Sequence, residues 1–214
     1  MANKETLEAV EKTLEDSKKQ DRNFKQNIDM VVNLKNVDLN DPNQRIEEEI
    51  VLPNGRGKKA KVGLFASGEL ALKSKDKVDK LIKPEELEDL SEDKKQAKKI
   101  AEAHDFFLAE APLMPTIGKA LGQILGPRGK MPKPIPLDAD VSDTVEKLRK
   151  TVIVRSKTKQ TFHTIVGTED MDKEKIAENV DTILRRVIEK LEYGKMNVRS
   201  VYIKPTMGKS QKII

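Results

Sequence analysis

A segment in the middle of the chain joins an apolar helical stripe to a short cationic loop: Ile117-Gly-Lys-Ala-Leu-Gly-Gln-Ile-Leu-Gly-Pro-Arg-Gly-Lys-Met-Pro132. Ile117, Leu121 and Leu125 recur at helical spacing. Gly126 is placed to end this helix, and Pro127 cannot continue it. The spacing therefore predicts a helix that stops at Gly126.

The loop after this helix contains no acidic residue. Arg128 and Lys130 supply charged donors on either side of Gly129, which allows close approach of the backbone. Pro132 stiffens the chain that follows. We expect this loop to present positive charge.

The composition of the 214-residue chain favours two small domains with densely charged surfaces. Charged and hydrophobic residues each make up 36% of the chain. Cysteine is absent, which excludes disulfides and thiolate metal sites, and the two histidines have no spacing that suggests a metal pair. No stretch approaches the roughly 20 apolar residues that span a bilayer, and the N-terminus lacks a signal-peptide core. We expect a soluble, cytoplasmic protein without metal or cofactor.

Positive charge is concentrated in three windows without Asp or Glu, residues 111–137, 147–168 and 193–214. They hold four, six and five Lys or Arg residues, so they carry +15, and the rest of a chain with net charge +5 carries −10. Such segregation is typical of a surface that binds a polyanion. The alternative is a set of solvated basic loops without a ligand.

The aromatic residues, five Phe and two Tyr, narrow the mode of binding. They are too scattered for a sheet that stacks several bases, and no helix has the basic face and preceding turn of a major-groove DNA reader. Structured RNA, contacted through phosphates, 2′-hydroxyls and shape, fits the composition better.

The two ends of the chain are similar in pattern. Apolar and polar residues alternate in several segments, which is typical of half-buried strands, and two amphipathic helices accompany them. The predicted elements are a helix around Val10, strands over 28–34 and, after the turn Asp41-Pro42-Asn43, over 46–52, strands over 152–155 and 161–166, a helix over 173–191 capped by Gly194, and a strand over 198–204.

The middle of the chain has α/β patterning, with continuous apolar runs that suit parallel strands covered on both faces. The predicted elements are strands over 62–66 and 106–109, helices over 69–80, 92–103 (with Ser91 as N-cap) and 142–150, and the helix that precedes Gly126. Neither end has enough elements for its own core. We therefore predict an α/β protein of two domains: an α+β domain with an antiparallel sheet from residues 1–57 and 152–214, and an inserted Rossmann-like domain from residues 58–151.

The segment Ile117–Pro132, with four glycines and two prolines in register, resembles the signature of the L-one family of large-subunit ribosomal proteins, of the archaeal or eukaryotic type. The resemblance covers essentially the full chain. It implies the same discontinuous plan, and a signature loop made of Gly126, Pro127, Arg128, Gly129, Lys130 and Pro132.

The C-terminal segment Arg199-Ser-Val-Tyr-Ile-Lys-Pro-Thr-Met-Gly-Lys-Ser210 is similar to the same family. The resemblance implies that the domain built from both chain ends makes the main ribosomal RNA contact, through a Thr-Met-Gly turn and through a Phe and polar residues at the first strand. On this sequence it points to Phe24, Asn27, Asp29, Ser200, Thr206, Met207 and Gly208. Lys204 and Lys209 flank the turn and are expected to meet phosphates.

The first strand departs from the family pattern. Many relatives have Lys before the Phe, Thr three residues after it and Glu five after it, where this chain has Asn23, Asn27 and Asp29. The replacements keep hydrogen-bonding capacity with a shorter acid. Two plainer interpretations stay open: Phe24 as a buried core aromatic and Met207 as a gap-filling methionine.

An enzyme is disfavoured by the motifs. Gly208-Lys-Ser210 resembles the end of a phosphate-binding P-loop, but Ile203 stands where the first glycine belongs and only four residues follow Ser210. No Gly-x-Gly-x-x-Gly turn follows the strand over 62–66.

The family resemblance implies a structural constituent of the large ribosomal subunit at the mobile exit-site stalk. The expected partners are large-subunit ribosomal RNA, exit-site tRNA and the protein's own mRNA, whose translation it would repress, with no membrane partner and a monomer away from the ribosome. A ribosome-assembly factor of the same fold and a nucleotide-binding enzyme are the alternatives.

Overall fold

The computed structural model describes residues 3–19, 22–41, 44–74, 76–136, 140–156 and 158–214. The chain divides into two compact units, one made of residues 1–59 and 150–214 (unit 1) and the other of residues 60–149 (unit 2). The sequence-based boundaries, 57/58 and 151/152, lie two residues away from these divisions. The turn predicted at Asp41-Pro42-Asn43 falls partly outside the described residues.

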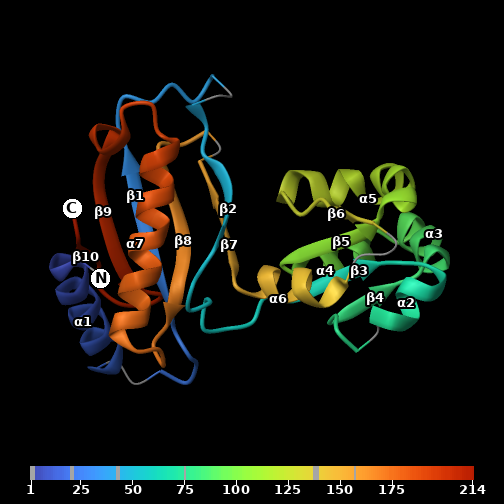
Figure 1. Cartoon of the computed structure of the whole chain (residues 1–214), viewed down its shortest axis with the longest axis horizontal. Helices are drawn as coiled ribbons and strands as arrows, with labels where there is room; N and C mark the ends of the chain where they lie inside the picture. The colour runs from blue at the N-terminus through green and yellow to red at the C-terminus, as the bar shows by residue number, and fades with distance from the viewer. Residues whose placement is uncertain (1–2, 20–21, 42–43, 75, 137–139, 157) are drawn as a thin grey trace. The chain divides into compact units, whose positions relative to one another are not determined.

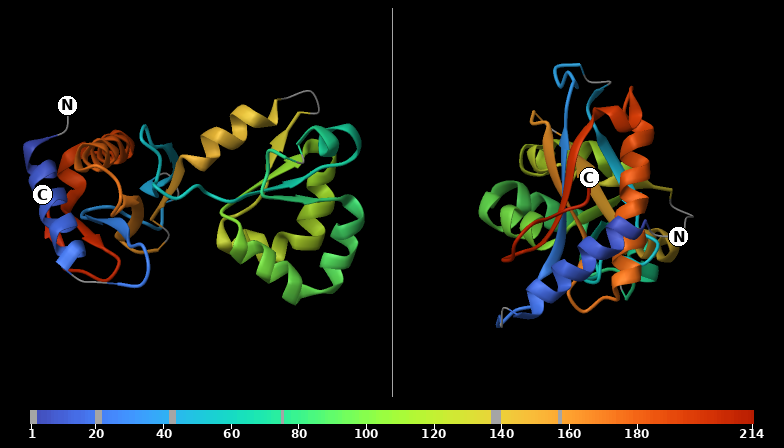
Figure 2. Two further views of the ribbon diagram at one scale, coloured as in Figure 1. Left: turned by 90° about the horizontal axis from the view of Figure 1, so that it is seen from below. Right: turned by 90° about the vertical axis from the view of Figure 1, so that its left-hand side faces the viewer.

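Unit 1 is built on a four-stranded antiparallel sheet with the order β10-β9-β1-β8, accompanied by a two-stranded antiparallel ribbon of β2 and β7 (Figure 1). Its elements are α1 (Lys4–Lys19), β1 (Asn27–Leu34), β2 (Glu47–Val51), β7 (Thr151–Arg155), β8 (Thr161–Thr168), α7 (Lys173–Lys190), the 3₁₀ helix η3 (Gly194–Asn197), β9 (Val198–Pro205) and β10 (Gln211–Lys212). Helices α1 and α7 pack side by side, as Figure 2 shows.

The period-2 alternation of β1 decides which face of this sheet is covered. Ile28, Met30 and Val32 are fully buried and belong to one core with apolar residues of α1 and α7. Asn27 and Asp29 begin the opposite row of β1, whose members are all partly exposed. We call this second side of the sheet the outer face, because alternate strand residues point to opposite sides.

The strand register fixes the neighbours on the outer face. Asp29 lies opposite Lys204 of β9 on one side and Ile165 of β8 on the other. Val31, the next residue of β1 on the outer face, lies between Tyr202 of β9 and His163 of β8. Asn33 follows it and lies between Ser200 and Thr161.

Unit 2 contains a wholly parallel sheet with the order β4-β3-β5-β6, so the mixed α/β class is confirmed. Its strands β3 and β5 are buried along their whole length, as their continuous apolar runs predict. The elements are β3 (Val62–Phe65), α2 (Gly68–Ser74), β4 (Lys80–Ile82), α3 (Pro84–Glu92), α4 (Lys94–Ala103), β5 (Phe106–Glu110), the 3₁₀ helix η2 (Ala111–Leu113), α5 (Met114–Arg128), β6 (Lys133–Ile135) and α6 (Val141–Arg149).

One helix prediction in unit 2 is wrong in extent: the helix expected over 69–80 ends at Ser74, and β4 begins at Lys80. The helix expected over 92–103 is confirmed as α4, but it begins at Lys94, because Asp93, and not Ser91, is its N-cap: Asp93 Oδ1 accepts the N–H groups of Lys95 (2.9 Å) and Gln96 (3.2 Å). The helix before it, α3, is absent from the predicted elements; it begins at Pro84, a residue suited to a first helical turn.

The helix predicted to stop at Gly126 continues through Pro127 to Arg128. Gly129 then adopts a left-handed backbone with φ 68°, and the N–H groups of Gly129 and Lys130 donate to the carbonyls of Gly126 and Leu125. This is the Schellman arrangement, which satisfies the last free carbonyls of a helix. Pro127 lacks one backbone N–H in the last turn, but its fixed φ is compatible with a helical backbone.

Three smaller differences follow from local geometry. Helix α7 ends at Lys190, and Gly194, with φ 54°, begins η3 instead of capping the helix. The proline-rich stretch includes the edge strand β6, where Pro134 pairs with Ala109. Strand β10 adds two residues to the unit 1 sheet.

No helix formed by the described residues is long and apolar enough to cross a membrane.

Candidate nucleic-acid interface

The turn Thr206–Lys209 follows β9 and is tied to the first residue of β1. The backbone N–H of Thr206 donates to the carbonyl of Asn27 (3.0 Å), and the Asn27 N–H donates back to Thr206 Oγ1 (3.2 Å). The Thr206 hydroxyl in turn lies 3.2 Å from the Asn27 carbonyl as a donor. The structure therefore brings together two residues that are 179 positions apart in the sequence.

Two further contacts hold this Thr206 turn on the N-terminal part of the chain, and a third closes the turn itself. The N–H of Met207 donates to Gln26 Oε1 (3.1 Å), and the N–H of Lys209 donates to Asp16 Oδ2 of α1 (2.9 Å). The N–H of Gly208 closes the turn on the carbonyl of Pro205 (3.2 Å). Backbone donors of the turn are thus used internally, and its side chains point outward: Met207 is 54% exposed.

Gln26 is an anchoring residue that the sequence patterns do not single out. It is 1% exposed, its Nε2 donates to Ser17 Oγ (3.0 Å), and its N–H donates to Glu169 Oε1 (2.9 Å). Ser17 also donates to Glu169 Oε2 (2.5 Å). A satisfied buried network of this kind fixes Gln26 between Ser17 of α1 and Glu169, and with it the platform under the Thr206 turn.

Gly208 is required by the packing of the turn itself, and not only for the close approach of a ligand. A Cβ at this position would lie 2.2 Å from Pro205 Cγ and 2.9 Å from Asp16 Oδ2. The glycine therefore makes room for the protein's own proline ring, whether or not a ligand approaches it.

Phe24 lies two residues before the buried Gln26 and is 50% exposed. The interpretation of Phe24 as a core aromatic is therefore wrong, and the exposure of Met207 contradicts its interpretation as a gap-filling residue. Lys204 is half-buried and Lys209 is exposed. The predicted site residues at this end of the sheet are thus largely accessible.

Asp29 and Ser200 occupy less open positions on the outer face. Burial raises the pKa of the Asp29 carboxyl, and the nearby charges of Lys204 and His163 oppose that rise. Ser200 is only 9% exposed, and its hydroxyl accepts a hydrogen bond from Asn33 Nδ2 (2.9 Å). Ser200 therefore orders the outer face through Asn33.

The signature loop lies in unit 2, and its cations are bound within that unit. Lys130 Nζ donates to the carbonyls of Ala101 (2.8 Å) and His104 (2.7 Å) at the end of α4, and burial lowers the pKa of this ammonium. Arg128 donates to Glu102 Oε1 (3.0 Å) and to the Ile124 carbonyl (3.3 Å). The ammonium of Lys130 is therefore turned inward, against the expectation that the loop presents this charge, because free carbonyls at a helix end attract cations. Arg128 is exposed and pairs with Glu102 at the surface.

The carboxyl edge of the parallel sheet, where a Rossmann-like fold binds nucleotides, holds an acid. Glu110 ends β5 and is 2% exposed; its two oxygens accept the N–H (2.8 Å) and the hydroxyl (2.7 Å) of Ser67, which follows β3. The Ser67 N–H at this position is therefore occupied by a carboxylate, which repels a phosphate. The geometry disfavours a dinucleotide site there.

Neither histidine is placed for metal binding. His104 is buried, its Nδ1 lies 2.9 Å from the Ile100 carbonyl, and its ring packs on Phe107. His163 lies on the outer face of unit 1. Across the described residues, no group of three or more His, Asp or Glu side chains is arranged to hold a metal ion.

Sequence comparison agrees with the two resemblances. The profile of the "Ribosomal protein L1p/L10e family" matches residues 14–209. The chain is 49% identical to the large ribosomal subunit protein uL1 of Methanocella arvoryzae over the whole of both chains, and 47% identical to that of Haloferax volcanii over 97% of both. It is 50% identical to that of Haloquadratum walsbyi over 87% of this chain and 88% of the relative. The chain therefore belongs to the ribosomal protein L1p/L10e family.

Proposed function

We propose that this chain is a constituent of the large ribosomal subunit and that unit 1 binds ribosomal RNA. The observation that carries the proposal is the set of hydrogen bonds between Thr206 and Asn27. These bonds hold the exposed side chains of Met207 and Lys209 next to the first strand. The names of the relatives as large ribosomal subunit proteins and the acid-free window over residues 193–214 support it.

In the proposed contact, Thr206 and Met207 of the turn recognise the RNA, and two lysine side chains bind its phosphates. Thr206 is exposed, and its hydroxyl, which donates to the Asn27 carbonyl, keeps a lone pair that can accept from a 2′-hydroxyl, while Met207 packs on a sugar or base. Lys204 and Lys209 neutralise phosphates. Because the turn is held by five internal hydrogen bonds with Asn27, Gln26 and Asp16, it is preorganised, and little ordering is needed on binding.

Two finer activities follow the family resemblance and are proposed with it. At the mobile exit-site stalk, the protein would contact exit-site tRNA and assist release of deacylated tRNA. It would also bind its own mRNA where the leader mimics the ribosomal site, and so repress translation. A gel shift with its own transcript leader tests the second role, and affinity no higher than for unrelated RNA would remove it.

Substitution at Thr206 tests the main proposal. Thr206→Val removes the hydroxyl and should weaken binding of the cognate ribosomal RNA fragment by about 1–3 kcal/mol with little change for unrelated RNA. Thr206→Ser keeps the hydroxyl and is the matched control. A Thr206→Val protein that folds and binds the fragment like the wild type would refute this assignment of the contact.

A further inference from the structure

A hollow lies at the opposite end of β1 from the Thr206 turn. We call it the Tyr193 pocket; its volume is about 280 Å³, and it is lined by Lys35, Asn36, Tyr193, Met196 and Asn197. Strand β1 is eight residues long, so its two ends are roughly 24 Å apart at about 3.4 Å per residue. The pocket is therefore distinct from the predicted contact.

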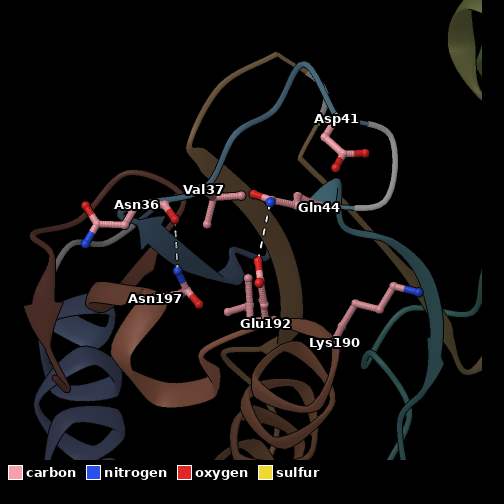
Figure 3. Close-up of a pocket in the computed structure, with 8 residues that line it drawn as sticks. Asn36, Val37, Asp41, Gln44, Lys190, Glu192 and Asn197 are labelled. Atoms are coloured by element: carbon pink, nitrogen blue, oxygen red, sulfur yellow. Dashed lines mark hydrogen bonds between the residues drawn. The ribbon is translucent and has the colours of Figure 1, made fainter.

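Asn197 makes this pocket rigid. It is 3% exposed, and its Nδ2 donates to the carbonyls of Lys35 and Asn36 (3.1 Å each), the second of which is drawn in Figure 3. Its Oδ1 accepts the N–H of Tyr193 (2.8 Å), and its carbonyl accepts the N–H of Lys35 (2.8 Å). One buried amide thus fastens the end of β1 to the segment that carries Tyr193 and Met196.

The apolar side chains of the pocket are unusually open. Tyr193 is 62% exposed and Met196 is 76% exposed, and both line the same hollow. Leu72 of unit 2 is also exposed, at 79%, but no described pocket includes it. A single exposed apolar side chain needs no explanation, whereas two that form one wall of a preorganised hollow mark a binding surface.

Positive charge surrounds the pocket. Lys35 lines it directly, and Lys195 is exposed beside Met196. Arg199 is an extra residue in β9: Asn33 of β1 pairs with Ser200, and the next residue, Leu34, pairs with Val198. The bulge leaves Arg199 exposed, where it lines a wider hollow together with Lys35 and Tyr193.

Two acids also reach this corner. Glu192 and Asp38 line the wider hollow together with Lys35, Tyr193 and Arg199, and Glu192 accepts a hydrogen bond from Gln44 Nε2 at 3.3 Å (Figure 3). The three cations Lys35, Lys195 and Arg199 outnumber these two acids. The lining of the Tyr193 pocket itself contains no acid. The charge arrangement favours an anionic ligand at the pocket.

We propose that the Tyr193 pocket binds an unpaired nucleotide of the RNA that unit 1 carries, with the base stacked on Tyr193 against Met196 and its phosphate between Lys35 and Arg199. Aromatic stacking combined with cations is how proteins hold single-stranded nucleic acid. The proposal rests on the proposed RNA-binding function and extends it to a second contact. The polar outer face of β1 connects the two ends.

The test uses the full chain with two probes, the ribosomal RNA fragment and a six-nucleotide oligoadenylate. Tyr193→Ala should weaken binding of both by about 5- to 100-fold, the range found when stacking residues are replaced by alanine. Tyr193→Phe keeps the ring and should bind both probes as the wild type does. Leu72→Ala is the matched control for loss of an exposed apolar side chain and should change neither affinity. Arg199→Ala should lower the salt slope for the oligonucleotide by about 0.7.

The outcomes separate this proposal from the main one. If Tyr193→Ala binds both probes normally while Thr206→Val loses the fragment, the pocket is not an RNA site and the main contact stands; an acidic protein would then be its candidate partner. If Tyr193→Ala weakens the oligonucleotide while Thr206→Val leaves the fragment unchanged, the pocket proposal stands and the turn assignment fails. Loss of binding that Tyr193→Phe does not restore would overturn the stacking mechanism.

Discussion

The Thr206 turn and the signature loop are similar as sequences, yet their side chains have different environments. Each follows a regular element, contains glycine and two flanking cations, and lies in a window without acids. In the turn, neither Lys204 nor Lys209 uses its ammonium in a hydrogen bond or ion pair with another described residue. In the loop, Lys130 and Arg128 both donate to groups of their own unit.

The difference teaches that a basic loop is a binding site only if its donors remain available. In the Thr206 turn, the backbone N–H groups donate to other parts of the described chain, and the ammonium groups of Lys204 and Lys209 do not. In the loop, Lys130 donates to free carbonyls at the end of α4, where a cation is favoured, and Arg128 pairs with Glu102 at the surface. Charge counted along the sequence does not separate the two cases.

The largest expected effect is in the signature loop, on stability. Lys130→Ala leaves the carbonyls of Ala101 and His104 without their charged donor, so we expect unit 2 to lose about 2–3 kcal/mol of its free energy of unfolding. Denaturant unfolding and amide exchange in α4 would measure it. The exposed Lys119 of the same helix as Arg128 is the control, and Lys119→Ala should be neutral.

RNA affinity completes this prediction. The Lys130→Ala protein should bind the ribosomal RNA fragment as the wild type does under conditions where both are folded. Reduced affinity at unchanged stability would mean that the loop is an RNA contact despite its internal bonds.

The glycines of the two regions should respond in opposite directions. Gly208→Ala places a methyl 2.2 Å from Pro205 Cγ, so the turn must shift, at a cost of about 1–2 kcal/mol in stability and with loss of RNA affinity. Gly126 lies inside α5 with nothing within 4 Å of a Cβ, so Gly126→Ala should stabilise unit 2 by about 0.5–1 kcal/mol. Thermal unfolding of the pair decides; a stabilising Gly208→Ala would contradict the geometry.

Strong periodicity made part of the fold predictable from sequence. The alternation of β1 and the apolar stripe of α7 depend on burial against one core, which the pattern of apolar residues records directly. The continuation of α5 past Pro127 depends on a cap at Gly129, and the start of α4 depends on the Asp93 side chain, so local propensity alone misplaced these two helix ends by two residues each.

The candidate site was predictable where the family motif records it, and not elsewhere. Thr206 and Asn27 were found through the resemblance. Gln26, Asn197 and the bulge at Arg199 have no sequence signature, because each acts through contacts between distant segments: Gln26 with Met207, and Asn197 with Lys35. The outward role expected for Lys130 failed for the same reason.

Salt dependence gives a smaller effect that distinguishes the cations of the two regions. Lys209→Ala should reduce the slope of log affinity against log salt by about 0.7–0.9, and Lys204→Ala should do the same, because each removes one of the proposed phosphate contacts. Arg128→Ala is the matched change in the signature loop and should leave the slope unaltered. Filter binding of the ribosomal RNA fragment at several salt concentrations measures the slopes, and equal changes for Lys209 and Arg128 would erase the contrast.

The smallest effect concerns the half-buried Asp29 near the turn. Because burial raises its folded pKa above the unfolded value of about 3.9, the folded state holds the proton more tightly, and stability falls as pH rises from that value through the folded pKa. Above the folded pKa the penalty is complete and constant. Asp29→Asn removes it, so the free energy of unfolding at pH 7 should rise by about 0.5 kcal/mol, the scale of most surface changes, and the acidic limb of the pH profile should flatten. Unfolding is best compared in a His163→Gln background, since that imidazole also acts on the carboxyl, with Lys204 retained. A lower stability of Asp29→Asn at neutral pH would show that the attraction of Lys204 outweighs burial, and that the outer face holds its acid as a partner for the turn.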